Sequence, residues 1–231
     1  YMAKHGKRPL MFTLEMTREQ IMENIIAQEL GLCHRDMING ELTEQDNSRL
    51  QRGLKMFSDL NVGVLDGRWT TNEIRHQLIT EIRTKGADCL MIDSLGKTKL
   101  PPGMSKTGEL HKIYNVICEE LVDIAVEMHI PVLLAHHLNR DSQRRGRDGR
   151  PTLGSLREAG EQWAHNVILI HRPYLITQDE EDKDSADFII VKARDGEVGT
   201  VELGFRGPSK TFYNIEEHRE PPRAMAGAYQ N

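Results

Sequence analysis

Short apolar runs alternate along the chain with segments in which apolar residues recur at helical spacing. The short runs predict strands at residues 9–14, 62–65, 89–93 and 131–135, the last of them buried. The helical spacing predicts helices that begin near residues 17, 43, 71 and 109, and the last of these runs to about residue 128. Thr17 and Gln20 form a capping-box pattern at the first helix. The alternation indicates an α/β fold with a mainly parallel, twisted sheet flanked by helices.

The pattern changes after residue 166. Short strands at 167–171, 188–193 and 200–205, the last two joined by a Gly-containing turn, predict an antiparallel edge at the C-terminal end. Residues 178–187 are acidic and predict a solvated loop, and residues 216–231 have little to bury and predict a flexible tail. We therefore expect one domain over residues 1–215 followed by this tail.

Composition limits the classes of function. With 38% hydrophobic residues the chain can bury one good core, and its net charge of −5 provides no overall attraction to nucleic acid or to an anionic membrane. Binding of a polyanion must come from a local patch. Cys33, Cys89 and Cys118 are few and widely spaced, which is typical of reduced thiols in the cytoplasm. No apolar run approaches the roughly 18 residues of a membrane span, and no signal-peptide pattern is present.

Polar residues follow three of the predicted strands. In open parallel sheets, ligands bind beyond the carboxyl ends of the strands, so Glu15, Asp93 and the pair His136–His137 are expected at one rim. Asp93 follows four apolar residues, an arrangement in which a carboxylate orients Mg²⁺, through water, beside a nucleoside triphosphate. Glu15 is suited to polarise an attacking water. Taken singly, Asp93 is equally well a turn cap and Glu15 an ordinary loop acid.

Adjacent residues of a strand point to opposite sides, so only one of His136 and His137 faces the rim. We take His137 as the candidate sensor of a terminal phosphate. A metal-dependent hydrolase that uses Asp93 with both histidines is a remote alternative, because one strand rarely directs two neighbours at the same ion.

A basic loop follows the histidines. Five arginines stand against two aspartates between positions 140 and 150, and glycines keep the loop flexible. Guanidinium groups can follow a phosphate backbone, whereas the low aromatic content of 5% argues against base stacking, so binding would tolerate any sequence. A solvated charged loop is the simpler interpretation. Arg157 and Gly160 stand where a helix end could hold phosphates more rigidly. The arginines of the loop are Arg140, Arg144, Arg145, Arg147 and Arg150.

Lys192 and Arg194 alternate on a late predicted strand and so share one face of a hairpin. An arginine displayed in this way can reach the phosphates bound to a neighbouring subunit. An exposed strand face is the simpler interpretation of the pair when it is considered alone.

Six segments, in order, resemble the RecA-like motor domain of the DnaB family of ring-shaped replicative helicases. They are Phe12-Thr-Leu-Glu-Met16, Met91-Ile-Asp93, His137-Leu-Asn-Arg140, Arg150-Pro151, Ser155-Leu-Arg-Glu-Ala-Gly160 and Lys192-Ala-Arg194-Asp-Gly196. The resemblance, which spans residues 8–214, implies a homo-hexamer that hydrolyses ATP with Mg²⁺ and translocates on single-stranded DNA in a bacterial or phage-infected cell, with a primase and a helicase loader as partners. The resemblance implies that Glu15 is the catalytic base, Asp93 the acid that organises Mg²⁺, and His137 the sensor of the terminal phosphate. It implies that Lys192 and Arg194 act on the neighbouring subunit, with Arg194 at the nucleotide. The implied DNA contacts are Arg157, Glu158 and Gly160.

One family element is missing. The phosphate-binding loop, Gly-x4-Gly-Lys-[Ser/Thr], is expected upstream of Pro9, and neither Gly96-Lys97-Thr98 nor residues 103–107 have its spacing. We therefore expect this chain alone to lack normal nucleotide binding. A histidine at position 137, where bacterial members usually carry glutamine, leaves the lineage open. Two alternatives remain: a non-catalytic nucleic-acid-binding or assembly fragment, and a RecA-like recombinase or clock-type ATPase that does not unwind DNA.

Overall fold

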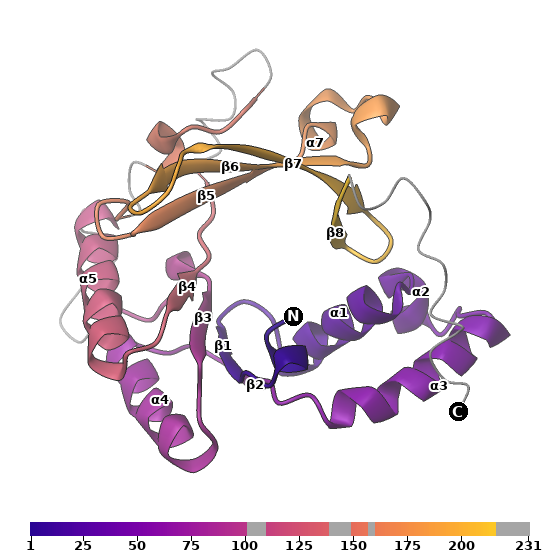
Figure 1. Cartoon of the computed structure of the whole chain (residues 1–231), viewed down its shortest axis with the longest axis horizontal. Coiled ribbons are helices and arrows are strands. Elements are labelled where there is room, and N and C mark those ends of the chain that lie inside the picture. Colours follow the sequence, from indigo (N-terminus) through magenta and orange to yellow (C-terminus); the bar gives the residue numbers. More distant parts are fainter. Residues whose placement is uncertain (101–109, 139–148, 157–159, 216–231) are drawn as a thin grey trace.

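The computed structural model describes residues 1–100, 110–138, 149–156 and 160–215, which form two four-stranded sheets (Figure 1). The parallel sheet has the order β2-β1-β3-β4 and the antiparallel sheet the order β5-β6-β7-β8. The α/β class is confirmed, and the antiparallel C-terminal strands form a sheet of their own. The strands are β1 (Pro9–Thr13), β2 (Gly63–Asp66), β3 (Cys89–Asp93), β4 (Val132–Leu134), β5 (Asn166–His171), β6 (Ser185–Ala193), β7 (Gly199–Arg206) and β8 (Thr211–Asn214).

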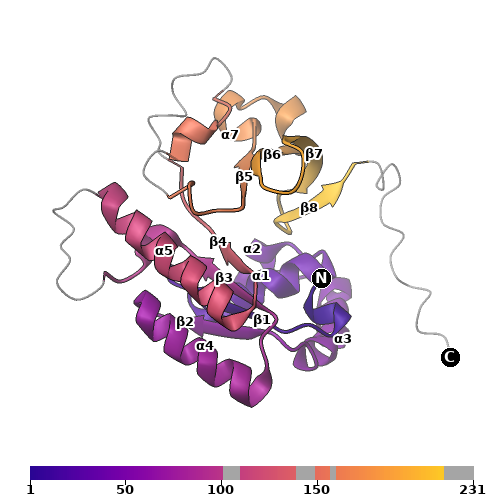
Figure 2. The ribbon, with the colours of Figure 1, turned by 60° about the vertical axis from the view of Figure 1, so that its left-hand side comes forward.

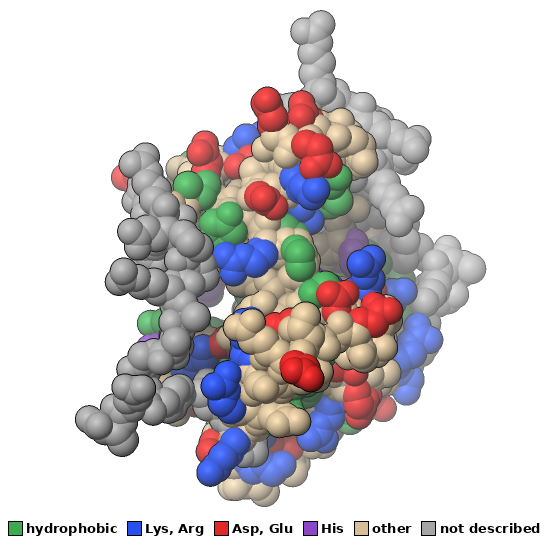
Figure 3. Space-filling view, turned by 90° about the vertical axis from the view of Figure 1, so that its right-hand side faces the viewer, with side chains coloured by type: hydrophobic (Ala, Val, Ile, Leu, Met, Phe, Trp, Pro, Cys, Tyr) green, Lys and Arg blue, Asp and Glu red, His purple; other side chains and the backbone are tan. Residues whose placement is uncertain are grey.

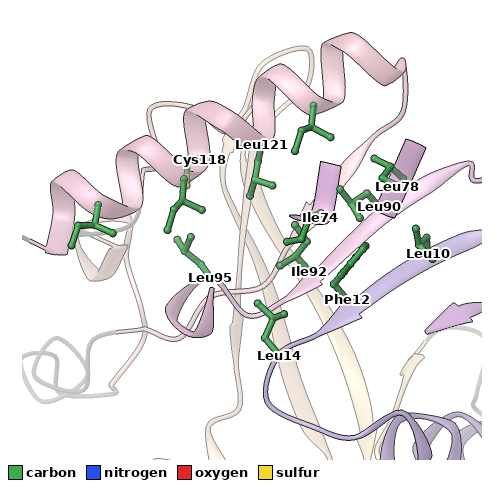
Figure 4. Packing of buried hydrophobic residues seen from close by; sticks show 13 residues of the cluster. Leu10, Phe12, Leu14, Ile74, Leu78, Leu90, Ile92, Leu95, Cys118 and Leu121 are labelled. Atoms are coloured by element: carbon green, nitrogen blue, oxygen red, sulfur yellow. The ribbon is translucent and has the colours of Figure 1, made fainter. Parts of the chain in front are cut away.

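One face of the parallel sheet is covered by α4 (Thr71–Lys85) and α5 (Leu110–Met128) (Figure 1). Alternate residues of the central strands point into this layer, so that Leu10, Phe12 and Leu90 are fully buried. Figure 4 shows them against Ile74 and Leu78 of α4 and Leu121 of α5. This core fixes β1 and β3, and with them the residues that follow both strands.

Three further helices extend from the other side of the molecule: α1 (Arg18–Leu30), α2 (His34–Asn39) and α3 (Glu44–Ser58). The predicted capping box is present, because the Thr17 hydroxyl accepts from the Gln20 amide and the Gln20 side chain accepts from the Thr17 amide. The sequence reasoning missed α2, whose six residues are too few to show a period. Figure 3 views the molecule from this side and shows acidic and basic side chains interspersed.

The turn between β7 and β8 joins the antiparallel sheet to α1 and α2. Lys210 Nζ donates to Asn24 Oδ1 at 2.8 Å, and Gln28 Nε2 donates to the Lys210 carbonyl at 3.1 Å. The His34 amide donates to the Pro208 carbonyl at 2.9 Å. The C-terminal sheet is thereby attached to α1 and α2, and Figure 2 shows β8 on the side of the molecule that carries these helices.

Two expectations about strands were wrong. The segment 178–187 is not a continuous loop, because β6 begins at Ser185, where Ala186 is buried and pairs with Leu203 of β7. The strand around residue 133 is not buried: Leu133 is 57% exposed because β4 is the last strand of the parallel sheet in the described chain. The remaining short elements are η1 (Ala3–His5), η2 (Leu95–Lys97), η3 (Leu153–Leu156), α7 (Tyr174–Thr177) and η4 (Glu180–Asp182).

Among the described helices, none combines the length and the apolar composition that a membrane span requires.

Candidate functional site

Backbone pairing brings the three predicted strand ends to one rim. Thr13 of β1 lies beside Asp93 of β3, and the Leu14 amide donates to the Asp93 carbonyl at 2.6 Å. On the other side of β3, the Ala135 amide donates to the Ile92 carbonyl at 2.9 Å. Parallel strands in this register place Glu15, Asp93 and His137 just beyond the same edge of the sheet.

Glu15 is the centre of this cluster. Its Oε1 atom accepts a hydrogen bond from Ser94 Oγ and lies 2.9 Å from Nε2 of His137. The hydrogen bond from Ser94 is the main cause that lowers the pKa of Glu15, followed by the bond to His137 and the charges of His137 and Lys97, while partial burial opposes them. Glu15 is therefore an ionised carboxylate at neutral pH, and its side chain is 26% exposed.

Asp93 has the opposite electrostatic environment. Partial burial raises the pKa of Asp93, the negative charge of Glu15 raises it further, and His137 acts in the other direction. Two carboxylates at one rim repel each other, and a cation between or beside them would relieve that repulsion. Carboxylate and hydroxyl oxygens are ligands that Mg²⁺ prefers, so Asp93 suits a magnesium ion held through water.

The two histidines point to different sides, as strand alternation predicts. His137 is 71% exposed and contacts Glu15, whereas His136 packs edge-on against Tyr114 of α5 with the ring centres 5.4 Å apart. A shared metal site for both histidines does not fit this arrangement. The structure brings His137 to the candidate site and places His136 in the interface with α5.

Lys192 and Arg194 lie elsewhere, beside the turn that begins at Gly160. Lys192 Nζ donates to the carbonyls of Glu161 and Gln162 at 2.8 and 3.3 Å. Arg194 Nη1 lies 2.8 Å from His165 Nε2. No hydrogen bond joins either cation to the Glu15 cluster within the described ranges.

Most of the predicted DNA-binding residues lie outside the described residues: Arg140, Arg144, Arg145, Arg147, Arg157 and Glu158. Two of the candidates nearby are described. Arg150 pairs with Asp187 at 3.1 Å and donates to Thr200 at 2.9 Å, which fastens it to the antiparallel sheet. Gly160 has a φ of 64°, and a Cβ at this position would lie 2.8 Å from Cys118 Sγ. The turn therefore depends on glycine here.

Sequence reasoning missed two residues. Ser94 directly follows the strand-end acid, and a small hydroxyl residue at that position was the available signal. His165, which contacts Arg194, lies 29 residues away from it, so no local pattern could have revealed the contact.

The parallel sheet, its helical cover and the antiparallel sheet beside it define a RecA-like domain. The ATPase domain of G40P has the same fold, with a TM-score of 0.82 at 24% identity over 92% of this chain and 76% of that one. A DnaB-like replicative helicase, solved in a study of its interactions with primase, gives a TM-score of 0.84 at 24% identity over 93% of this chain and 53% of its own.

Sequence comparison identifies the family. Residues 1–214 match the family described as DnaB-like helicase C terminal domain. The replicative DNA helicase DnaB of Haemophilus influenzae is 32% identical over 221 residues, which cover 93% of this chain. The chain belongs to the DnaB-like helicase C-terminal domain family. It spans about half the length of the curated relatives it matches, 46% of the Haemophilus protein.

Proposed function

We propose that this chain forms most of the motor domain of a hexameric helicase that uses ATP to translocate on single-stranded DNA and unwind duplex DNA during replication. The observation that carries this proposal is the contact between Glu15 and His137 at the rim that also holds Asp93. Family membership over residues 1–214 supports the same reaction. A primase and a helicase loader are the proposed partners.

The proposed roles of Glu15, His137 and Asp93 follow from the electrostatics of the rim, and those of the other residues follow from the resemblance to the family. Glu15, ionised and bonded to Ser94, accepts the proton of the attacking water. His137 touches the same carboxylate oxygen, so a change at the terminal phosphate that moves His137 also moves Glu15. Asp93 would hold Mg²⁺ through water, and the ion would neutralise charge on the phosphates. Lys192 and Arg194 act on the nucleotide of the neighbouring subunit, and the arginine segments with Glu158 and Gly160 contact the DNA strand.

The phosphate-binding loop comes, in this proposal, from a segment outside this chain that adds an apolar strand along β4. Leu133 of β4 is 57% exposed, and Ile168 and Ile170 of β5 are 52% and 51% exposed, which are high values for apolar strand residues. Both strands end their sheets in the described chain, and the antiparallel sheet lies beyond β4 in Figures 1 and 2. A strand between them would pair with the backbone of both edge strands and join the two sheets.

ATP turnover tests the proposal. This chain is expected to show no magnesium-dependent hydrolysis, while a version extended upstream through a Gly-rich Lys-Thr loop should hydrolyse ATP and unwind forked DNA. Glu15→Gln in the extended protein should abolish turnover while nucleotide still binds, whereas Glu41→Gln, which neutralises an exposed loop acid, should not. Equal turnover by the Glu15→Gln variant would contradict the role of Glu15. Turnover without unwinding would favour a recombinase or clock-type ATPase instead.

A further inference from the structure

A hollow of about 330 Å³ lies beyond the carboxyl ends of β2 and β3. Its lining combines two cations, a hydroxyl and one apolar side chain: Arg68, Lys99, Thr98 and Leu100. None of these residues belongs to the six segments that resemble the helicase family. Its volume is at the lower end of the roughly 300–1,000 Å³ typical of small-molecule sites, so the hollow suits one small anionic group.

The walls of this hollow are fixed by contacts between the two loops that form them. The Lys99 amide donates to the Trp69 carbonyl at 2.9 Å, and Trp69 Nε1 donates to the Asp66 carbonyl at 3.1 Å. Leu100 packs against the main core. A site with such walls binds without the cost of ordering its loops.

The charges in the hollow are available to a ligand. Arg68 is exposed and has no ion-pair partner among the residues that the structure describes. Lys99 Nζ lies 3.6 Å from Glu73, but the two side chains are 56% and 46% exposed, and such pairs are weak in water. Thr98 is 5% exposed, and its hydroxyl has no hydrogen-bond partner in the described part of the chain.

We propose that this hollow binds one backbone phosphate of single-stranded DNA. The guanidinium of Arg68 offers paired donors that match phosphate oxygens, and the Lys99 ammonium adds a compact point charge. The inference rests on the proposed function, because it places a further DNA contact at the rim that carries Glu15 and Asp93. The contact reads no base, so it holds any strand that passes the rim.

Salt-dependent DNA binding tests this proposal. Binding of a labelled oligothymidylate to this chain is measured by fluorescence anisotropy over a series of salt concentrations. Each phosphate contact contributes a slope of about 0.7 in the plot of log affinity against log salt for single strands. Arg68→Gln and Lys99→Gln should each make the slope shallower, and the double variant, which removes the single phosphate contact, should make it shallower by about 0.7. Arg68→Lys, which keeps the charge, should retain the slope.

Arg83→Gln is the matched control. Arg83 is exposed near the C-terminal end of α4. At a rise of 1.5 Å per residue it lies about 18 Å from the start of the helix, which is beyond the screening length of about 10 Å at 0.1 M salt. The Arg83→Gln substitution removes one positive charge, as Arg68→Gln does, and should leave the slope of log affinity against log salt unchanged. Thermal unfolding of all variants checks that the fold is retained.

The outcomes separate the two proposals. Normal DNA binding with an unchanged slope in the double variant overturns the phosphate site and leaves the helicase proposal intact. The double variant could instead lose affinity for inorganic triphosphate while the salt dependence of DNA binding stays the same. That result would assign the hollow to a free phosphate and would also overturn the proposed DNA contact. Failure of the unaltered chain to bind the oligothymidylate at low salt overturns DNA binding by this chain, and the hollow with it.

Discussion

The buried ion pair between Arg8 and Glu81 offers a direct test of how the parallel sheet is held together. Arg8 Nη2 donates to Glu81 Oε2 at 2.6 Å, with both side chains less than one-tenth exposed at 7% and 8%. Arg8 Nη1 donates to the Gly86 carbonyl at 2.5 Å. Arg8→Met removes both bonds and leaves a buried carboxylate. The pair also joins the start of β1 to the end of α4, so its loss loosens the strand that leads to Glu15.

We expect Arg8→Met to lower the free energy of unfolding by about 3 kcal/mol. Loss of one partner of a buried pair typically costs about 3–5 kcal/mol. The lower end applies because Lys85 Nζ remains 3.5 Å from Glu81 Oε1 and partly compensates the charge. Replacing both partners, as in Arg8→Met with Glu81→Met, removes the uncompensated charge and should recover most of the loss.

Urea unfolding followed by circular dichroism measures these differences. Arg75→Met is the control, because Arg75 pairs with Glu127 at 3.2 Å on the surface, with side chains 33% and 50% exposed. Its expected cost is below about 1 kcal/mol. If Arg8→Met costs no more than Arg75→Met, or if the double variant is less stable than the single one, the reasoning is refuted.

Three further outcomes are expected. Burial alone raises the pKa of Glu81, but the hydrogen bond and charge of Arg8 outweigh it and the net pKa is lowered. The stability that ionised Glu81 contributes is therefore complete above the unfolded pKa of about 4.3 and is lost as pH falls through the lower folded pKa. The difference in unfolding free energy between the unaltered chain and Glu81→Gln should therefore narrow only below about pH 4.3. A gap that narrows between pH 7 and 5 would contradict this. Gly160→Ala should destabilise the fold by more than about 1 kcal/mol because of its positive φ and the contact with Cys118. Gly154→Ala should be nearly neutral in the same urea assay, because among the described residues the nearest atom to the new Cβ is Thr152 Oγ1 at 3.6 Å. Ser94→Ala should raise the pKa of Glu15 toward its ordinary value, measured by a carboxyl-carbon NMR titration, and an unchanged pKa would remove Ser94 from the site.

Much of the parallel sheet could be predicted from local patterns. The apolar runs at β1 and β3 and the capping box at Thr17 are local signals, and the structure contains all three. The rule that ligand-binding residues gather at the carboxyl ends of parallel strands was sufficient to group Glu15, Asp93 and His137 from the sequence. Their chemical roles stay predictions.

The rest depended on contacts between distant segments. Burial of β4 was predicted from its apolar composition, but exposure of Leu133 is decided by which strand lies beside it. The start of β6 at Ser185 depends on pairing with β7, since backbone hydrogen bonds form whatever the side-chain polarity. The bonds from Lys192 to the carbonyls of Glu161 and Gln162 cross about thirty residues of sequence and leave no local pattern.

The pairing of Leu14 with Asp93 limits which sequence changes the rim can tolerate. Deletion of a single residue inside β1 would shift every later side chain of that strand to the opposite face and would move Glu15 out of register with Asp93. An exchange of one side chain for another at the rim, such as histidine for glutamine at position 137, leaves this spacing intact. The domain can therefore accept new chemistry at these positions far more readily than a change in the number of residues leading up to them.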